Sequence, residues 1–564
     1  MEEFPIACSA MNEVNLTTQN KIMIIGIDGA TFRIIDPLVR RGELPALERL
    51  IEQGTRGILR STLHPLSPPA WASFMTGMNP GKHGIFDFIQ RDPTSYEFRP
   101  VNGSYLGGRT LWSLLSEAGK RVGIINVPMT YPPEQVNGFL ISGMDSPRVD
   151  KAYSFPATLA GEIDEACGGY LVDCSTQGPK GLSREEMTDL YTQRLLQVTR
   201  NRGSVARYLW RKHSLDFFMV VFGEADRIQH AVGEGIESFG EGESSWLCDR
   251  ITEVYQQIDW EIGQLLDQID ETCTVMIVSD HGAASYKRVL NLTHWLIENG
   301  FLYLSGSRAQ GTLMHWAERA KHKLLHSLGM EPRQARRRTS PLLRVIDWEK
   351  TKAYAFGAFG SIFINLRGRE PCGPVTPGAE YEDLCREISE SLLEARDPAS
   401  GAPLVEAVHL GQHVYTGDYV LHAPDLLVVP AGDYFVRNTL DHYQRSAAYP
   451  AGKYGDRSIW HTGKHTPDGV FIAWGPQINR GTEIQDARIV DVAPTILYLL
   501  GQPILWEMDG RVLEGAIDPG HLAHSPVCLA DAETREIAGP SQKLYSEAEE
   551  REIEERLRGL GYLG

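Results

Sequence analysis

Continuous apolar runs alternate with amphipathic stretches through the first half of the chain. Each run is apolar at nearly every position, which is typical of a parallel strand buried on both faces. The stretches between them, such as residues 184–212 and 251–269, repeat their apolar positions with helical spacing. The alternation predicts an α/β fold with a mostly parallel central sheet. The predicted strands lie at 21–28, 121–127, 216–222 and 274–279.

The second half of the chain predicts further strands and helices around an insertion. Residues 352–366 are rich in strand-forming positions, 381–395 have a helical pattern, and 426–429 and 470–474 form short apolar runs. Proline stands early in the helical segment 491–500, where its missing N–H is harmless. We divide the chain into a flexible arm (1–20), a first core part (21–290), a helical insertion or cap (291–345), a second core part (346–515) and a C-terminal extension with a helix (516–564).

The composition and net charge of the chain limit which kinds of partner it can bind. Apolar residues make up 42% and charged residues 23% of the chain, as in ordinary globular proteins. The net charge of -18 argues against a nucleic-acid duplex as partner, because such binding needs a basic surface. A small anionic substrate stays compatible, since a metal site supplies local positive charge.

Targeting signals are not visible in the sequence. The N-terminus has no basic region followed by an apolar one, and no apolar run reaches the ~18 residues of a membrane span. The cysteines are scattered without a CxxC pair, so neither a disulfide framework nor a zinc ribbon is indicated. We therefore expect a cytoplasmic protein with no membrane span.

Several separated segments carry carboxylate, imidazole or hydroxyl groups close to predicted strand ends. Ligands of open α/β sheets bind outside the carboxyl ends of the strands, and carboxylate with imidazole suits zinc and similar divalent ions. Taken singly, such an aspartate is more often a helix cap or turn former, and a lone histidine is more often structural. Their combination indicates a metal site. The residues are Asp28, Ser67, Asp226, His230, Asp280, His281 and His465.

The order and spacing of these segments resemble the alkaline phosphatase superfamily. Within it, the chain is similar to the type I phosphodiesterase/nucleotide pyrophosphatase-like enzymes, and most of all to the predicted phosphohydrolase/phosphomutase branch. The resemblance spans roughly residues 21–515 and includes NVPMTYPP at 126–133 and MDGRVL at 508–513. It implies a three-layer α/β/α sandwich with an inserted cap region.

The resemblance also implies two divalent metal ions and a serine nucleophile. One ion would be held by Asp28, Asp280 and His281 with the Ser67 oxygen, and the other by Asp226, His230 and His465. Zinc is the family expectation, and manganese also suits these ligands. The family's nucleophile precedes a Thr-Gly pair, which is Thr76-Gly77 here, and Ser67 fits that spacing better than Ser61, Thr62 or Ser73.

Three residues are candidates for substrate binding. Relatives carry a phosphoryl-binding Asn soon after the HGI segment, and Asp87 stands near that point here. Lys464 either neutralises phosphate or faces solvent. Asn126 either lines the pocket or belongs to a loop held by its prolines. Sulfatases carry a C/S-x-P-x-R motif. Residues 67–71 read SPPAW and lack its arginine, which disfavours a sulfatase.

The function that this resemblance implies is metal-dependent hydrolysis of a small phosphate ester, preferably a phosphodiester or nucleotide pyrophosphate, through a covalent intermediate on Ser67. A phosphomonoesterase and a phosphomutase or phosphotransferase on the same core are alternatives. A further alternative, from another class, is a superfamily member that binds a ligand without turnover.

Overall fold

The computed structural model describes residues 20–560 and 562, except 93, 148–151, 180, 242–244, 306–340, 440–446, 451–461 and 532–544. Most of the predicted arm (1–20) and most of the predicted insertion (291–345) therefore lie outside the described residues. Contacts divide the chain into two compact units. The first unit comprises 1–83, 102–284 and 463–544, and the second comprises 84–101, 285–462 and 545–564. Residues 346–462, which the sequence division assigned to the second core part, thus cluster with 285–345.

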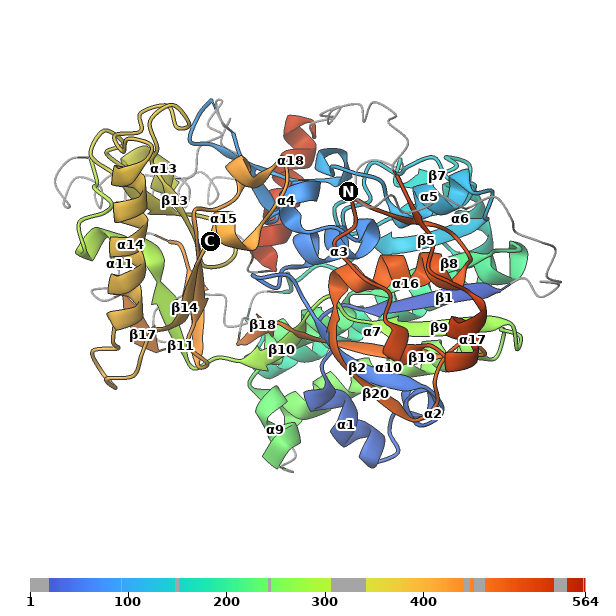
Figure 1. Ribbon diagram of the computed structural model, residues 1–564. Helices are drawn as coiled ribbons and strands as arrows, with labels where there is room; N and C mark the ends of the chain where they lie inside the picture. Colours follow the sequence, from blue (N-terminus) through green and yellow to red (C-terminus); the bar gives the residue numbers. More distant parts are fainter. Residues whose placement is uncertain are drawn as a thin grey trace. The chain divides into compact units, whose positions relative to one another are not determined.

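A nine-stranded, mostly parallel sheet forms the centre of the first unit (Figure 1). The strand β1 pairs in parallel with both β8 and β9, and β5 pairs in parallel with β8 and β6. The strand β19 runs antiparallel to β9 and β2. The order is β20 (Thr482–Arg488), β2 (Thr55–Arg60), β19 (Asp468–Trp474), β9 (Cys273–Val278), β1 (Lys21–Ile27), β8 (Phe217–Phe222), β5 (Val122–Val127), β6 (Gly138–Ser142) and β7 (Ser154–Phe155).

The apolar runs that predicted strands do form the middle of this sheet. Every residue of β5, β8 and β9 is buried, as expected for strands covered on both faces. The predicted α/β fold with a mostly parallel sheet is therefore confirmed.

Two groups of helices cover the sheet (Figure 1). In one group, α10 (Trp246–Leu266) packs on α7 (Arg184–Lys212), α8 (Glu224–Val232) and α2 (Pro45–Gln53). In the other, α3 (Ser67–Thr76) packs on α16 (Val492–Leu499) and α5 (Leu111–Glu117). The long helix α7 begins with a capping box in which Ser183 and Glu186 satisfy each other's backbone N–H groups.

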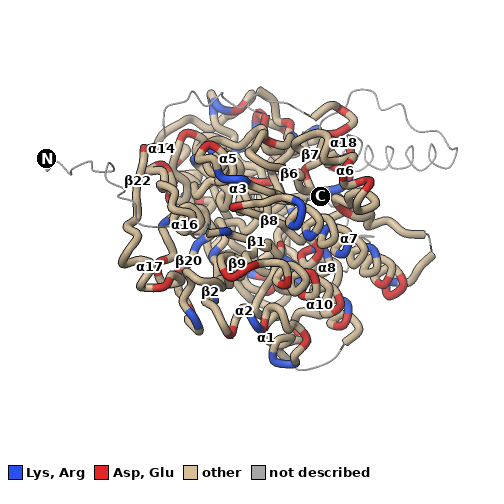
Figure 2. Tube along the Cα trace, turned by 90° about the vertical axis from the view of Figure 1, so that its right-hand side faces the viewer, with Lys and Arg blue, Asp and Glu red and all other residues tan. Residues whose placement is uncertain are grey.

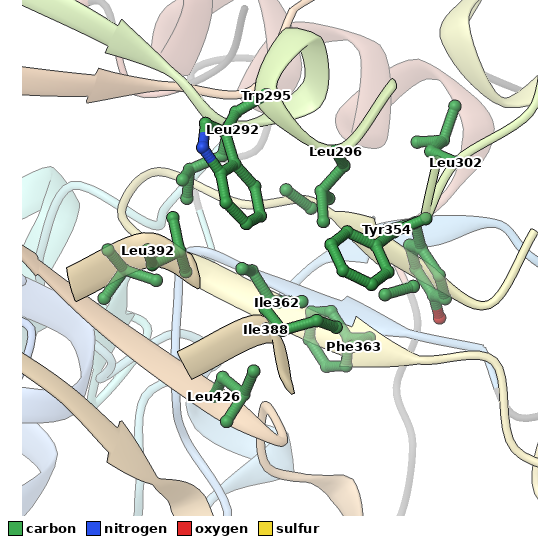
Figure 3. Close-up of a cluster of buried hydrophobic side chains, with 14 of the residues drawn as sticks. Leu292, Trp295, Leu296, Leu302, Tyr354, Ile362, Phe363, Ile388, Leu392 and Leu426 are labelled. Carbon is green, nitrogen blue, oxygen red and sulfur yellow. The ribbon is translucent and has the colours of Figure 1, made fainter. Parts of the chain in front are cut away.

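The second unit has a smaller core of its own. A four-stranded sheet runs in the order β12 (Ala353–Ala355), β13 (Ser361–Ile364), β15 (Leu426–Pro430) and β14 (Val405–Leu410). Side chains from α11 (Leu292–Glu298) and α14 (Ala379–Glu394) pack against it (Figure 3). The buried cluster includes Trp295, Leu296, Tyr354, Ile362, Ile388 and Leu392.

Charge is mixed along the described chain. Acidic residues of α7 lie near its N-terminal end and are followed by basic ones, whereas the charged residues of α10 are mainly acidic (Figure 2). No described helix combines the length and the apolar composition needed to cross a bilayer.

Candidate metal and active site

The topology of the sheet brings the predicted ligands to one edge. Asp28 follows β1, α8 with Asp226 follows β8, and Asp280 with His281 follows β9. These three strands are parallel neighbours, so their carboxyl ends meet at the same edge. A residue far along the chain joins them, because β18 (Gly463–Thr466), which carries His465, contacts α8.

The first group of donors surrounds the Nε2 atom of His281. This atom lies 3.6 Å from Asp28 Oδ1 and 3.4 Å from Asp280 Oδ2. The hydroxyl oxygen of Ser67 lies 3.4 Å from the same Nε2 and 3.5 Å from Asp28 Oδ1. All four side chains are buried. Two carboxylates, an imidazole and a hydroxyl therefore converge on one point.

The second group surrounds Asp226. Its Oδ1 atom lies 3.2 Å from His230 Nε2 and 3.3 Å from His465 Nε2, and the two imidazole nitrogens are 2.8 Å apart. Asp226 and His230 face the same way because they are one turn apart on α8. The rings of His281 and His465 stack at 3.6 Å between centroids, so the two groups adjoin.

Backbone carbonyls fix the orientation of two imidazoles. The Nδ1 atom of His281 lies 3.0 Å from the carbonyl oxygen of Gly282, and Nδ1 of His465 lies 2.7 Å from that of Pro65. With Nδ1–H donating to a carbonyl, each Nε2 presents its lone pair to the carboxylates. Metal-binding histidines have this arrangement.

The shifted pKa values of the carboxyl groups and imidazoles at this site favour the binding of a cation. Burial, followed by repulsion from Asp280, raises the pKa of Asp28 well above its usual value. Burial and then the charge of Asp226 raise the pKa of Asp280 to about 8. Burial lowers the pKa of His281 to about 4 and that of His465 to about 3, so both imidazoles are neutral, as metal ligation requires.

The donors present fit divalent ions of the zinc type. Asp28, Asp280 and His281 offer ligand atoms within 4.8 Å of one another, and so do Asp226, His281 and His465. The Oδ2 atom of Asp280 is buried and has no hydrogen-bond partner among the described residues. An unpaired buried carboxylate oxygen is costly, and a bound cation would satisfy it. Oxygen and imidazole nitrogen are ligands that zinc and manganese accept.

Helix α3 presents Ser67 to the first group. Ser67 is the first residue of the helix, and Pro68 and Pro69 complete its start, where proline is well tolerated. One turn later, Trp71 donates from Nε1 to Asp28 Oδ2 over 3.1 Å. The helix therefore positions both the hydroxyl and the carboxylate beside it. Sequence reasoning missed Trp71, although its spacing of four residues from Ser67 places both on one helical face.

A second residue that sequence reasoning missed is Gln229, on α8. It donates from Nε2 to the Gly29 carbonyl over 2.9 Å, and its Oε1 accepts from the Tyr255 hydroxyl over 3.2 Å. Gly29 in turn donates its N–H to Asp280 Oδ1 over 3.2 Å. This series of hydrogen bonds, called the Gln229 relay below, joins the segments that follow β1, β8 and β9. Gly29 has a φ of +70°, and a Cβ there would lie 3.0 Å from Asp226 Cβ, so glycine is required at this close approach.

We expect Gln229→Leu to weaken metal binding without unfolding the protein. Losing such an outer contact reduces metal affinity by about 10–100-fold in comparable sites. Competition with a chromophoric chelator measures this affinity. Gln256→Leu is the matched control, because Gln256 is an exposed glutamine on α10 that pairs with Glu43. Equal metal affinity in wild type and Gln229→Leu would show that the relay does not position the ligands.

The three predicted substrate-binding residues have different surroundings. Lys464 is buried in β18 beside His465. Asn126 is buried at the end of β5. Asp87 belongs to the second unit, where its carboxylate accepts backbone N–H groups of Phe88 at 2.6 Å and Ala358 at 2.9 Å, and burial raises its pKa to about 7. Contact with substrate stays a prediction for all three.

The fold and the two donor groups define a candidate metal-dependent hydrolase with a buried serine at its centre. The type I phosphodiesterase/nucleotide pyrophosphatase family model matches residues 22–468, and the chain belongs to this family. It is accordingly a hydrolase that acts on phosphoric ester bonds.

Solved structures give a distant likeness. Mouse ectonucleotide pyrophosphatase/phosphodiesterase 5 is 11% identical with a TM-score of 0.49, covering 88% of this chain and 100% of that chain. The human protein of the same name is 12% identical with a TM-score of 0.48 and the same coverage. A comparison with curated protein sequences gives no match. The family assignment rests on the family model.

Proposed function

We propose that the chain is a phosphodiesterase that uses two divalent metal ions and Ser67 as nucleophile. The observation that carries this proposal is the convergence of the Ser67 hydroxyl with both carboxylates and the imidazole of the first donor group. Asp28, Asp280, His281 and the Ser67 oxygen would hold one ion, and Asp226, His230 and His465 the other. When bound, such ions lower the pKa of the serine hydroxyl and stabilise charge on the attacking and leaving oxygens.

The covalent steps of the reaction take place at the Ser67 oxygen. The Ser67 oxygen attacks phosphorus, the bond to the leaving alcohol oxygen breaks, and that oxygen takes up a proton. The hydroxyl proton of Ser67 passes to solvent. Water then attacks the seryl phosphate ester and breaks the Oγ–P bond, which restores the serine and releases a phosphomonoester. The N-terminus of α3 favours negative charge beside Ser67 throughout.

Trp71 keeps the carboxylate of Asp28 from rotating away from Ser67 by its hydrogen bond. Positioned groups of this kind make attack effectively unimolecular.

We also propose a cytoplasmic location, which is supported by the free thiols of all cysteines among the described residues.

A panel of p-nitrophenyl esters tests the reaction. With zinc or manganese added, we expect bis(p-nitrophenyl) phosphate to be hydrolysed with a higher kcat/KM than p-nitrophenyl phosphate, and p-nitrophenyl phosphate to accumulate. Preference for the monoester would make the protein a phosphomonoesterase instead. Transfer of the phosphoryl group to added glycerol as the main product would make it a phosphotransferase.

A further inference from the structure

A buried arginine lies beside the second donor group. Arg227 follows Asp226 on α8 and is 7% exposed. Its Nη1 atom lies 3.9 Å from Asp226 Oδ2. The other oxygen of that carboxylate, Oδ1, is the atom that lies near His230 and His465. The carboxylate of Asp226 therefore has its imidazole neighbours at one oxygen and a guanidinium at the other.

A second carboxylate balances the charge of this arginine. The Nη2 atom of Arg227 lies 3.6 Å from Asp173 Oδ2, and both side chains are only 8% exposed. This Oδ2 atom has no hydrogen-bond partner among the described residues, so the guanidinium is what compensates its charge. Arg227 can face two carboxylates at once because its planar guanidinium carries separate terminal nitrogens. Arg227 and Asp173 thus form a buried pair with no net charge.

Helix α7 holds the segment that carries Asp173. Residues 169–179 form no helix or strand of their own. The Oδ1 atom of Asn201 accepts the N–H of Leu171 over 2.8 Å, and the Nη2 atom of Arg202 donates to the Val172 carbonyl over 2.9 Å. Asn201 and Arg202 belong to α7, which packs on α8. The backbone just before Asp173 is therefore fixed, and its ion pair joins this segment to α8.

Two effects of Arg227 on a cation at the second donor group oppose each other. A guanidinium by itself repels a divalent ion through the Coulomb interaction. A partner on the outer oxygen of a ligating carboxylate, in contrast, fixes the orientation of that carboxylate and strengthens metal binding. Because Asp173 balances the charge of Arg227, the repulsion is reduced and the orienting effect remains.

We infer that Arg227 is a positioning residue for the second metal ion. It attracts Oδ2 of Asp226, so that Oδ1 stays directed at the point that His230 and His465 also face. Asp173 keeps the guanidinium in place and removes its net charge. This inference rests on the proposed two-metal function and adds to it two residues that act on the ion through Asp226.

Zinc binding in the absence of substrate tests the inference. The double variant Asp173→Asn/Arg227→Gln replaces both charged groups by neutral amides, so no buried charge is left uncompensated. We expect chelator competition to show one of the two zinc ions binding about 10–100-fold more weakly than in wild type. In the His465→Ala background, which keeps only the first site, the same substitutions should change zinc affinity less than about twofold, because Asp226 is not a ligand there. With cobalt(II), whose visible absorption depends on coordination geometry, only the absorption of the second site should change.

Asp189→Asn/Arg250→Gln is the matched control, because this ion pair of 2.8 Å joins α7 to α10 at more exposed positions. It should bind both zinc ions as wild type does. Unchanged or tighter zinc binding in Asp173→Asn/Arg227→Gln overturns the inference, and so does equal weakening of both ions, which a purely structural role would produce. A misassigned nucleophile would leave all these results unchanged, whereas a wild type that binds only one ion would overturn the two-metal function together with the inference.

Discussion

Replacing Ser67 by alanine is expected to reduce the hydrolysis of bis(p-nitrophenyl) phosphate by at least about 10³-fold, or ~4 kcal/mol in activation free energy. The reason is that the variant has no oxygen at the point where the first donor group converges, so no seryl ester can form. The bound metal should stay near two equivalents, because six of the seven proposed ligands are unchanged. Steady-state assays and metal analysis on the same preparation measure both quantities.

Ser73→Ala controls for disturbance of the same helix. Ser73 is also buried on α3, but its hydroxyl pairs with His83 at 2.9 Å and not with a proposed ligand. This variant should keep kcat within a few-fold of wild type. If Ser67→Ala retained full activity, or if both variants lost activity equally, Ser67 would not be the nucleophile.

Removing the metals is expected to have the second-largest effect. Dialysis against a chelator should abolish activity and lower the thermal unfolding midpoint, and zinc or manganese should restore both. Burial, and then repulsion from Asp280 and Asp226, raises the pKa of Asp28, and burial, and then repulsion from Asp226, raises the pKa of Asp280. A bound cation would relieve both the burial of charge and the repulsion. A ligand at 100 times its Kd adds about 2.7 kcal/mol of stability per site.

Single ligand variants should separate the two sites. We expect His465→Ala to retain one equivalent of metal and to lose activity, whereas His409→Ala, an exposed histidine on β14, should match wild type. Full activity in metal-free protein would contradict the proposed two-metal mechanism. Two equivalents of metal in His465→Ala would contradict the assignment of the second site.

Strands and their terminal residues were predictable from sequence because both depend on local patterns. A largely apolar run that ends close to an acid, as in β1 with Asp28 or β9 with Asp280, identifies a buried strand and its functional end together. Asp226 and His230 lie on one face of α8, and this follows from their separation by four residues, which is visible in the sequence.

Contacts between distant segments were not predictable in this way. Gln229 meets Gly29 only because β1 and β8 are neighbours in the sheet, and no pattern within α8 distinguishes it from other polar positions. Asp173 pairs with Arg227 from a segment that forms no helix or strand, so no local pattern reveals this ion pair. The grouping of 346–462 with 285–345 likewise follows from packing, since its helices and strands alternate much as those of the first unit do.

Anomalous diffraction at the zinc absorption edge, from crystals of the zinc-loaded protein, locates the metals directly. We predict two peaks about 3.5–4 Å apart. One should lie ~2.0–2.2 Å from ligand atoms of Asp28, Asp280 and His281 and next to the Ser67 oxygen, and the other at that distance from Asp226, His230 and His465. Peaks elsewhere, or a fully loaded site with the Ser67 hydroxyl turned away from both ions, would contradict the account.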